Sequence, residues 1–129
     1  MPTPPRTGTI AWTDLTVEDA AGVRDFYKEV VGWRAEPVSM GDYDDFGMVP
    51  PGGDAAVAGV CHARGANADI PPQWLIYVVV ESVERSAARC AELGGEVVAG
   101  PRTLGGGRFA VVRDPAGAVL AIYEPEAER

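Results

Sequence analysis

Hydrophobic positions change their period along this chain in a way that predicts a strand followed by a helix. Residues 75–80 form a continuous apolar, β-branched run, which is typical of a buried strand. Apolar residues then recur at helical spacing: Val83, Ala87, Cys90 and Ala91. Ser82 can cap this helix, because its hydroxyl can accept from the free amides of the first turn. Gly94-Gly95 supplies the left-handed end that many helices use.

Residues 10–33 carry the same strand–helix unit, with a cap at Asp19 and a closing glycine at Gly32. The apolar helical positions here are Val23, Phe26, Tyr27 and Val30. The caps Asp19 and Ser82 lie 63 residues apart, and the same offset relates the pairs Gly32–Gly95 and Phe46–Phe109. Because the matches continue past the helix into the following strands, we interpret them as an internal duplication.

Three further strands are expected after each helix, over residues 34–40, 43–49, 55–62, 97–102, 108–113 and 118–123. Strong turn signals separate them, at residues 50–53 and at Asp114-Pro115-Ala116-Gly117. The run Gly105-Gly106-Gly107 is interpreted as a hairpin loop, because a phosphate cradle would need a following helix and a Lys-Ser/Thr pair. The predicted fold is α+β, with two tandem βαβββ units whose curved mixed sheets surround a concave pocket and whose helices lie outside.

We expect one domain over residues 8–125, made of units 8–63 and 73–125, with a linker at 64–72 and a flexible tail at 1–7. The formal net charge of −8 argues against nucleic acid as a partner. It would suit a cationic ligand, or it serves only to keep the protein dispersed. No apolar run approaches the ~20 residues that span a bilayer, and the start has no targeting pattern, so a cytoplasmic protein is expected. Cys61 and Cys90 lie in no metal spacing and are expected to be buried free thiols.

Several short motifs accompany the paired βαβββ pattern: Phe26-Tyr27, Val31-Gly32-Trp33, Ala91-Glu92-Leu93-Gly94-Gly95 and Asp114-Pro115-Ala116-Gly117. With them the chain resembles the vicinal oxygen chelate superfamily, which holds glyoxalases, extradiol dioxygenases and bleomycin-resistance proteins. The run Pro72-Gln73-Trp74-Leu75-Ile76-Tyr77 is similar to a poorly characterised bacterial group within it. The resemblance implies the fold, and it implies a homodimer. It leaves the activity open, because one fold hosts unrelated chemistries.

Enzymes of this superfamily hold a divalent metal with His or Glu side chains on the inner strands of both units. Carried over by position, these ligands fall on Trp12, Leu75, Ala58 and Ala121. None of the four side chains can bind a divalent metal, which needs imidazole, thiolate or carboxylate donors. We therefore expect no metal or other cofactor at the usual position.

Strand alternation predicts which residues share a face with those four positions. The ligand-binding set predicted in this way is Trp12, Asp14, Ala58, Val60, His62, Leu75, Tyr77, Ala121 and Tyr123, with Thr16 beside them. A cavity with small residues, aromatic walls and few polar groups is typical of a small-molecule site. Trp12 is placed in this pocket, and Trp74 in packing or in a subunit contact.

Four polar features carry the candidate chemistry, each with a structural alternative. Asp14 could hold a ligand amine or act as a general base, or it could bond Tyr77 or a backbone amide. His62 could act as acid or base near neutral pH, although a bond to loop carbonyls is favoured. Arg64 could bind a ligand carboxylate, but anchoring the linker is favoured. The run Asp42-Tyr43-Asp44-Asp45 is interpreted as a solvated turn, with binding of a hard cation as the alternative.

Two functions remain, and both need a small-molecule ligand. The first is a protein that binds a small aromatic or cationic molecule without the metal of the superfamily. The second is an enzyme, similar to a lyase, isomerase or dioxygenase, that uses Asp14 and His62 in acid–base chemistry or holds a metal at other positions. A structural or regulatory protein with a vestigial pocket is a weaker third possibility.

Overall fold

A computed structural model describes residues 5–126 of the chain. Most of the predicted tail at residues 1–7, and the last three residues, lie outside the described part. The chain divides into two compact units. Residues 12–74 form the first unit, and the remaining described residues form the second.

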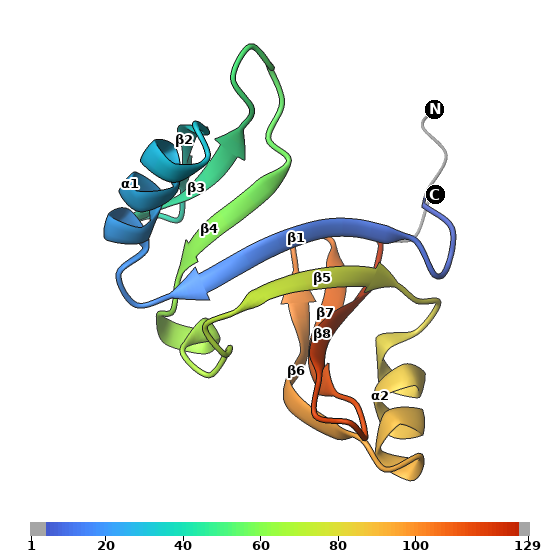
Figure 1. The fold of residues 1–129 in the computed structure, drawn as a ribbon. Coiled ribbons are helices and arrows are strands. Elements are labelled where there is room, and N and C mark those ends of the chain that lie inside the picture. Colours follow the sequence, from blue (N-terminus) through green and yellow to red (C-terminus); the bar gives the residue numbers. More distant parts are fainter. Residues whose placement is uncertain (1–4, 127–129) are drawn as a thin grey trace. The chain divides into compact units, whose positions relative to one another are not determined.

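The first unit has the predicted βαβββ order (Figure 1). Its elements are β1 (Ile10–Val17), α1 (Ala20–Val30), β2 (Arg34–Ser39), β3 (Asp44–Val49) and β4 (Ala58–His62). The strands are ordered β2-β3-β4-β1, with β1 parallel to β4 and the other pairs antiparallel. Strand β4 is shorter than predicted, because residues 55–57 precede the ladder. The linker contains a 3₁₀ turn at Gly65–Asn67.

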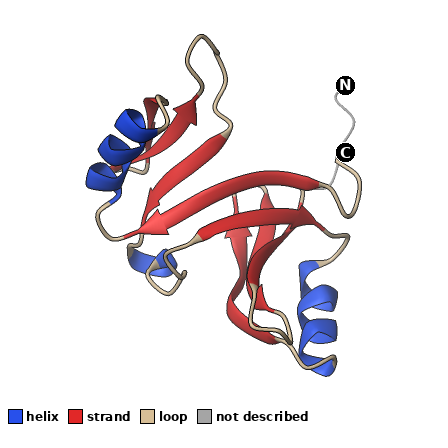
Figure 2. Ribbon diagram, in the orientation of Figure 1, coloured by secondary structure: helices blue, strands red, loops and turns tan. Residues whose placement is uncertain are grey.

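The second unit repeats this order (Figure 2). Its elements are β5 (Trp74–Val79), α2 (Val83–Glu92), β6 (Glu96–Leu104), β7 (Gly107–Arg113) and β8 (Val119–Glu124). The strands are ordered β6-β7-β8-β5, with β5 parallel to β8. The α+β class and the two βαβββ units are therefore confirmed.

Both helices begin at the predicted caps. The Asp19 carboxylate accepts from the Gly22 backbone N–H at 3.0 Å, and the Ser82 hydroxyl accepts from the Arg85 N–H at 3.2 Å. Gly32 follows α1 with φ of +88°, a conformation that a Cβ would disfavour. The predicted capping chemistry is confirmed in both units.

Each helix packs on one face of its own sheet. Ala20, Val23 and Tyr27 of α1 pack with four sheet residues: Phe46, Met48, Ala58 and Val60. Val83 of α2 packs in the same way with Ala110, Val112 and Ile122. The predicted stripe of α1 is too wide, since Phe26 and Val30 are 57% and 64% exposed. Only the part of the stripe that points at the sheet packs into the core, although the Phe26 ring meets the Tyr27 ring edge-to-face.

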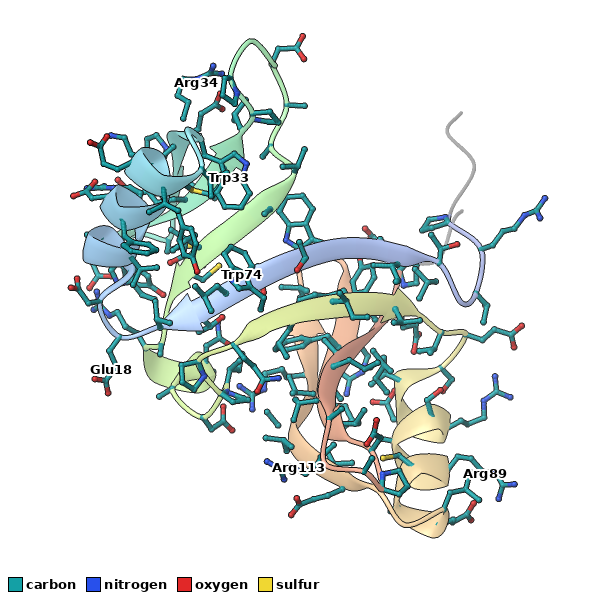
Figure 3. All side chains as sticks on the ribbon, viewed as in Figure 1. Glu18, Trp33, Arg34, Trp74, Arg89 and Arg113 are labelled. Atoms are coloured by element: carbon teal, nitrogen blue, oxygen red, sulfur yellow. The ribbon has the colours of Figure 1, made fainter. Side chains whose placement is uncertain are left out.

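Trp74 belongs to an aromatic cluster on the helix side of the first unit (Figure 3). Its indole N–H donates to the Tyr27 hydroxyl at 3.1 Å. The ring centroids of Trp74 and Trp33 lie 5.9 Å apart in an edge-to-face arrangement, which is favourable for aromatic pairs. The packing role predicted for Trp74 is confirmed.

Candidate functional site

The face of each sheet that its helix leaves uncovered is called here the helix-free face. In the first unit this face holds Trp12, Asp14, Gly59 and Cys61. Asp14 and Gly59 are register partners in the parallel β1–β4 ladder, so their side-chain positions lie on the same face. A Cβ built on Gly59 would lie within 4 Å of Asp14, Trp12 and Cys61, which places all four residues together.

The shared face predicted for Ala58 and Val60 is wrong. Both residues are buried against α1, on the opposite face from Asp14. The position that corresponds to Ala121 in the first unit is Gly59, since Asp14 pairs with Gly59 just as Tyr77 pairs with Ala121. The offset between the units is thus 62 at this strand instead of 63, and a slip of one residue exchanges the faces of a strand.

Asp45 adds a buried carboxylate to the helix-free face of the first unit. It is 8% exposed, and its Oδ1 accepts from the His62 backbone N–H at 2.9 Å. The expectation that it belongs to a solvated turn is therefore wrong. Burial, followed by the neighbouring carboxylates of Asp14 and Asp45, raises the pKa of the Cys61 thiol far above its usual range. The Cys61 thiol is therefore held in its protonated form beside the Asp45 carboxylate.

His62 does not join Asp14. It follows Val60 by two residues, and its ring lies 6.1 Å from the Phe46 ring, which packs on the helix side. The Tyr43 ring meets the His62 ring edge-on at 5.3 Å. Because Asp14 and His62 lie on opposite faces of one sheet, the structure does not bring together the acid–base pair predicted from the sequence.

Arg64 anchors the start of the linker, as favoured from the sequence. Its guanidinium carbon lies 4.0 Å from the centroid of the Tyr43 ring, and one of its nitrogens lies 3.6 Å from an Asp42 carboxylate oxygen. Asp42 is largely exposed, so this ion pair contributes little to stability. The cation–π contact is the more specific of the two interactions.

The helix-free face of the second unit is aromatic. Tyr77 and Ala121 are register partners, and Phe109 is the register partner of Tyr123. The rings of Tyr77 and Phe109 lie 6.2 Å apart. Tyr77 and Phe109 are almost fully buried, whereas Tyr123 is partly exposed. Leu75 shares this face by strand alternation and is completely buried. Four predicted site residues thus lie on one face: Leu75, Tyr77, Ala121 and Tyr123.

Sequence reasoning missed Phe109 and Arg102 on this face. Arg102 is the register partner of Phe109, and its guanidinium carbon lies 5.8 Å from the Phe109 ring centroid. The alternation of β7, in which Ala110 and Val112 face the helix, would have placed Phe109 opposite them. Arg102 could not be found in this way, because the register of the β6–β7 ladder shifts just before it.

Two surface depressions lie elsewhere. One of about 420 Å³ lies beside the start of α2, with Ser82, Arg85 and Arg89 in its wall. Another of about 300 Å³ lies where β1 ends, with Val17, Glu18 and Ile70 in its wall. Neither contains a residue of the predicted ligand-binding set, although Thr16, which was predicted beside that set, lies in the wall of the second depression.

A family model matches residues 9–122, which is most of the chain. It is described as the glyoxalase/bleomycin resistance protein/dioxygenase superfamily. The chain belongs to this superfamily. The resemblance inferred from the sequence motifs is therefore confirmed, and the superfamily's metal positions can be compared with the residues found here.

Curated relatives in the superfamily are longer than this chain. A Mycobacterium tuberculosis protein that carries a glyoxylase name, CFP32, is 32% identical over 92% of this chain and 45% of its own length. The Streptomyces peucetius anthracycline biosynthesis protein DnrV is 32% identical over 90% of this chain and 46% of its own length. The chain thus spans about half the length of the curated relatives that it matches.

A solved structure supports the fold. Methylmalonyl-CoA epimerase from Streptomyces coelicolor aligns with a TM-score of 0.56 and 15% identity, over 95% of this chain and all of the other. At this identity the likeness shows the fold alone. Within the described residues, no helix is long and apolar enough to cross a membrane.

The metal of the superfamily does not fit the residues at its usual positions. In register terms these positions are Trp12 and Gly59 in the first unit, and Leu75 and Ala121 in the second. An indole N–H only donates, the side chains of Leu75 and Ala121 have no lone pair to offer, and Gly59 has no side chain. In the described part of the chain, no group of three or more His, Cys, Asp or Glu residues is placed to hold a metal ion.

Proposed function

We propose that this chain binds a small aromatic molecule without the metal of its superfamily. The observation that carries the proposal is the aromatic helix-free face of the second unit. Tyr77 and Phe109 form a buried floor there, and partly exposed Tyr123 and Arg102 lie beside them. Few polar groups among many apolar ones are typical of small-molecule sites.

The donor chemistry supports binding rather than metal-dependent catalysis. Of the four positions that would hold a metal, three carry apolar or aromatic side chains and the fourth is Gly59, which has none. Such side chains offer a ligand van der Waals contact and bury its apolar surface. Burial contributes a favourable free energy of roughly 25 cal/mol for each Å² of apolar surface removed from water. A planar ligand gains most from this kind of face, because rings stack on rings.

The relatives give weaker support of the same kind. DnrV, at 32% identity, is named for anthracycline biosynthesis, and anthracyclines are planar polycyclic aromatics. Its printed name concerns that protein, whose length is about twice the part matched here. The name nevertheless agrees with an aromatic ligand class. Of the residues predicted from the sequence, the proposed site on the second unit keeps four: Leu75, Tyr77, Ala121 and Tyr123.

The test is a thermal-shift and calorimetric screen with planar aromatics, from naphthalene to anthraquinone derivatives. We expect at least one compound to raise the Tm, and we expect Tyr123→Ala to weaken its binding about tenfold by loss of ring stacking. Phe26→Ala is the matched control, since Phe26 is an exposed aromatic residue on α1. The proposal is wrong if no compound shifts the wild-type Tm, or if Tyr123→Ala binds as tightly as Phe26→Ala.

The homodimer and the cytoplasmic location stay predictions from the sequence. Size-exclusion chromatography with light scattering checks the first, with an expected mass of twice the 13.6 kDa of one chain. Fractionation of the source cells checks the second.

A further inference from the structure

The backbone conformation at Gly59 does not require glycine. It is not among the glycines of positive φ, so any residue could adopt its conformation. The space beside it is what excludes a side chain. A Cβ at this position would lie 3.1 Å from the Asp14 Cβ, 3.6 Å from the Trp12 Nε1 and 3.7 Å from the Cys61 Sγ. The indole of Trp12 thus lies against the bare backbone of β4.

The second unit has different residues at the two positions that correspond to Trp12 and Gly59. Ala121 stands at the register position of Gly59, and Leu75 stands at the position of Trp12. In the first unit the large side chain of Trp12 thus goes with Gly59, which has no side chain. In the second unit the medium-sized side chain of Leu75 goes with the small side chain of Ala121. Close-packed neighbours are expected to change size in this compensating way. The comparison indicates that Gly59 accommodates the size of Trp12.

The pair in the first unit nevertheless leaves its large residue exposed. Leu75 is completely buried, whereas Trp12 is 37% exposed. Trp33 and Trp74, the other two tryptophans, pack edge-to-face on the helix side. An indole that lies against the backbone and is still 37% exposed can stack against a ligand.

The negative charges near Trp12 favour a ligand whose ring carries a positive charge. Asp14 and the Trp12 indole both lie beside Gly59, and the Asp45 carboxylate lies on the same face of the sheet. An indole attracts cations through its negative ring face, and a carboxylate strengthens this attraction. The net charge of −8 acts in the same direction at longer range.

We infer that Gly59 positions Trp12 as a stacking platform for a planar aromatic cation, whose charge is balanced by Asp14. This inference rests on the proposed aromatic-binding function and goes beyond its site, because it adds a binding face on the first unit and names the ligand class there. Trp12 and Asp14 contact the ligand, and Gly59 is a positioning residue that acts through Trp12.

The first experiment compares two probes of nearly equal shape by isothermal titration calorimetry, naphthylmethylamine and naphthylmethanol, at neutral pH. We expect the amine to bind the wild-type protein about tenfold more tightly than the alcohol, because only the amine is cationic. Asp14→Asn should remove this preference, and Trp12→Leu should weaken both probes. In ¹H–¹⁵N spectra the amine should shift the indole N–H signal of Trp12 and leave those of Trp33 and Trp74 in place.

The second experiment tests the role of Gly59 with a matched glycine. Gly47 is the register partner of Gly59 on β3, and a Cβ there would lie 3.1 Å from the Ala56 Cβ and away from Trp12. Gly59→Ala should weaken binding of the amine about tenfold, as expected from the loss of one stacking contact, whereas Gly47→Ala should leave it unchanged. In the double variant Gly59→Ala with Trp12→Leu, which copies the second unit, the Tm should recover and binding should stay weak.

The outcomes separate the inference from the function on which it rests. If aromatic probes bind but amine and alcohol bind equally, or Trp12→Leu and Gly59→Ala bind like the wild type, the inference is wrong and the proposed function stands. If the wild type binds no aromatic probe at all, both are wrong. If Gly47→Ala weakens binding as much as Gly59→Ala, Gly59 has no specific role in positioning Trp12.

Discussion

The two βαβββ units share their helix caps, strand order and helix-facing cores, but their helix-free faces differ. The first unit has Asp14 and Cys61 beside the partly exposed Trp12, and Asp45 beside Cys61. At the corresponding register positions the second unit has Tyr77, Phe109 and Tyr123. The residues that fold each unit are thus similar, whereas the helix-free face is acidic in the first unit and aromatic in the second. This contrast agrees with the proposal that the helix-free faces, and not the helices, bind the ligand.

The largest expected effect is a difference in stability loss between two hydrophobic residues at equivalent positions, Leu75 and Trp12. Leu75→Ala should lower the free energy of unfolding by about 2–5 kcal/mol, because a fully buried side chain is lost and a cavity remains. Trp12→Ala should cost only about 1–2 kcal/mol, since its partly exposed indole buries less surface. Urea unfolding of the two variants measures both values. An equal loss would show that Trp12 is a core residue and not an exposed platform.

A smaller effect depends on pH and on Cys61, which occupies the register position of Tyr123. An ordinary cysteine ionises near pH 9.0, whereas burial and nearby carboxylates raise the pKa of Cys61 in the folded protein. Above that pH the unfolded chain loses a proton that the folded chain keeps, so stability falls as pH rises. The contribution is fully present below about pH 8, and the slope approaches about 1.4 kcal/mol for each pH unit above 9.

Urea unfolding between pH 7 and pH 10 measures this slope. The decline should be less steep in Cys61→Ala than in the wild type, and Cys90→Ala is the matched control. An unchanged slope in Cys61→Ala would contradict the burial of a protonated thiol beside Asp14 and Asp45.

The smallest expected effect compares the two helix caps. Asp19→Ala should lower stability by about 1 kcal/mol, because the Gly22 N–H loses its acceptor. Ser82→Ala should cost less, since Glu124 still accepts from the Val83 N–H of α2 at 2.9 Å. Amide hydrogen exchange in the first turn of each helix measures the difference, and Asp19→Ser should retain most of the protection. A greater loss in α2 than in α1 would show that Glu124 does not support the helix start.

Local chemistry made much of the fold predictable. A cap needs a short polar side chain next to an apolar helical pattern, and a helix end of positive φ needs glycine, so Asp19, Ser82 and Gly32 identified the helices directly. The hairpin at Asp114–Gly117 was equally clear. The Asp114 Oδ1 accepts from the Ala116 N–H at 2.8 Å, and Gly117 has a φ of +94°.

The candidate site was less predictable, because it depends on pairing between distant strands. The offset of 63 holds for β1 and the helices, but the fourth strand of the first unit is shifted by one residue. A single residue was enough to assign Ala58 and Val60 to the helix-free face and to miss Gly59. Asp45 shows the same limit, since its burial depends on a bond to His62, which lies 17 residues away.

The sequence by itself determined two βαβββ units, their caps and turns, the superfamily resemblance, and the lack of metal donors at Trp12, Leu75 and Ala121. These features depend on residue types and on short spacings, which a linear chain displays completely. The tertiary structure decided which side chains share a helix-free face. It placed Trp12 beside Gly59 and Phe109 beside Tyr77. Strand register controls that choice, and it follows from loop lengths and packing that no local pattern records.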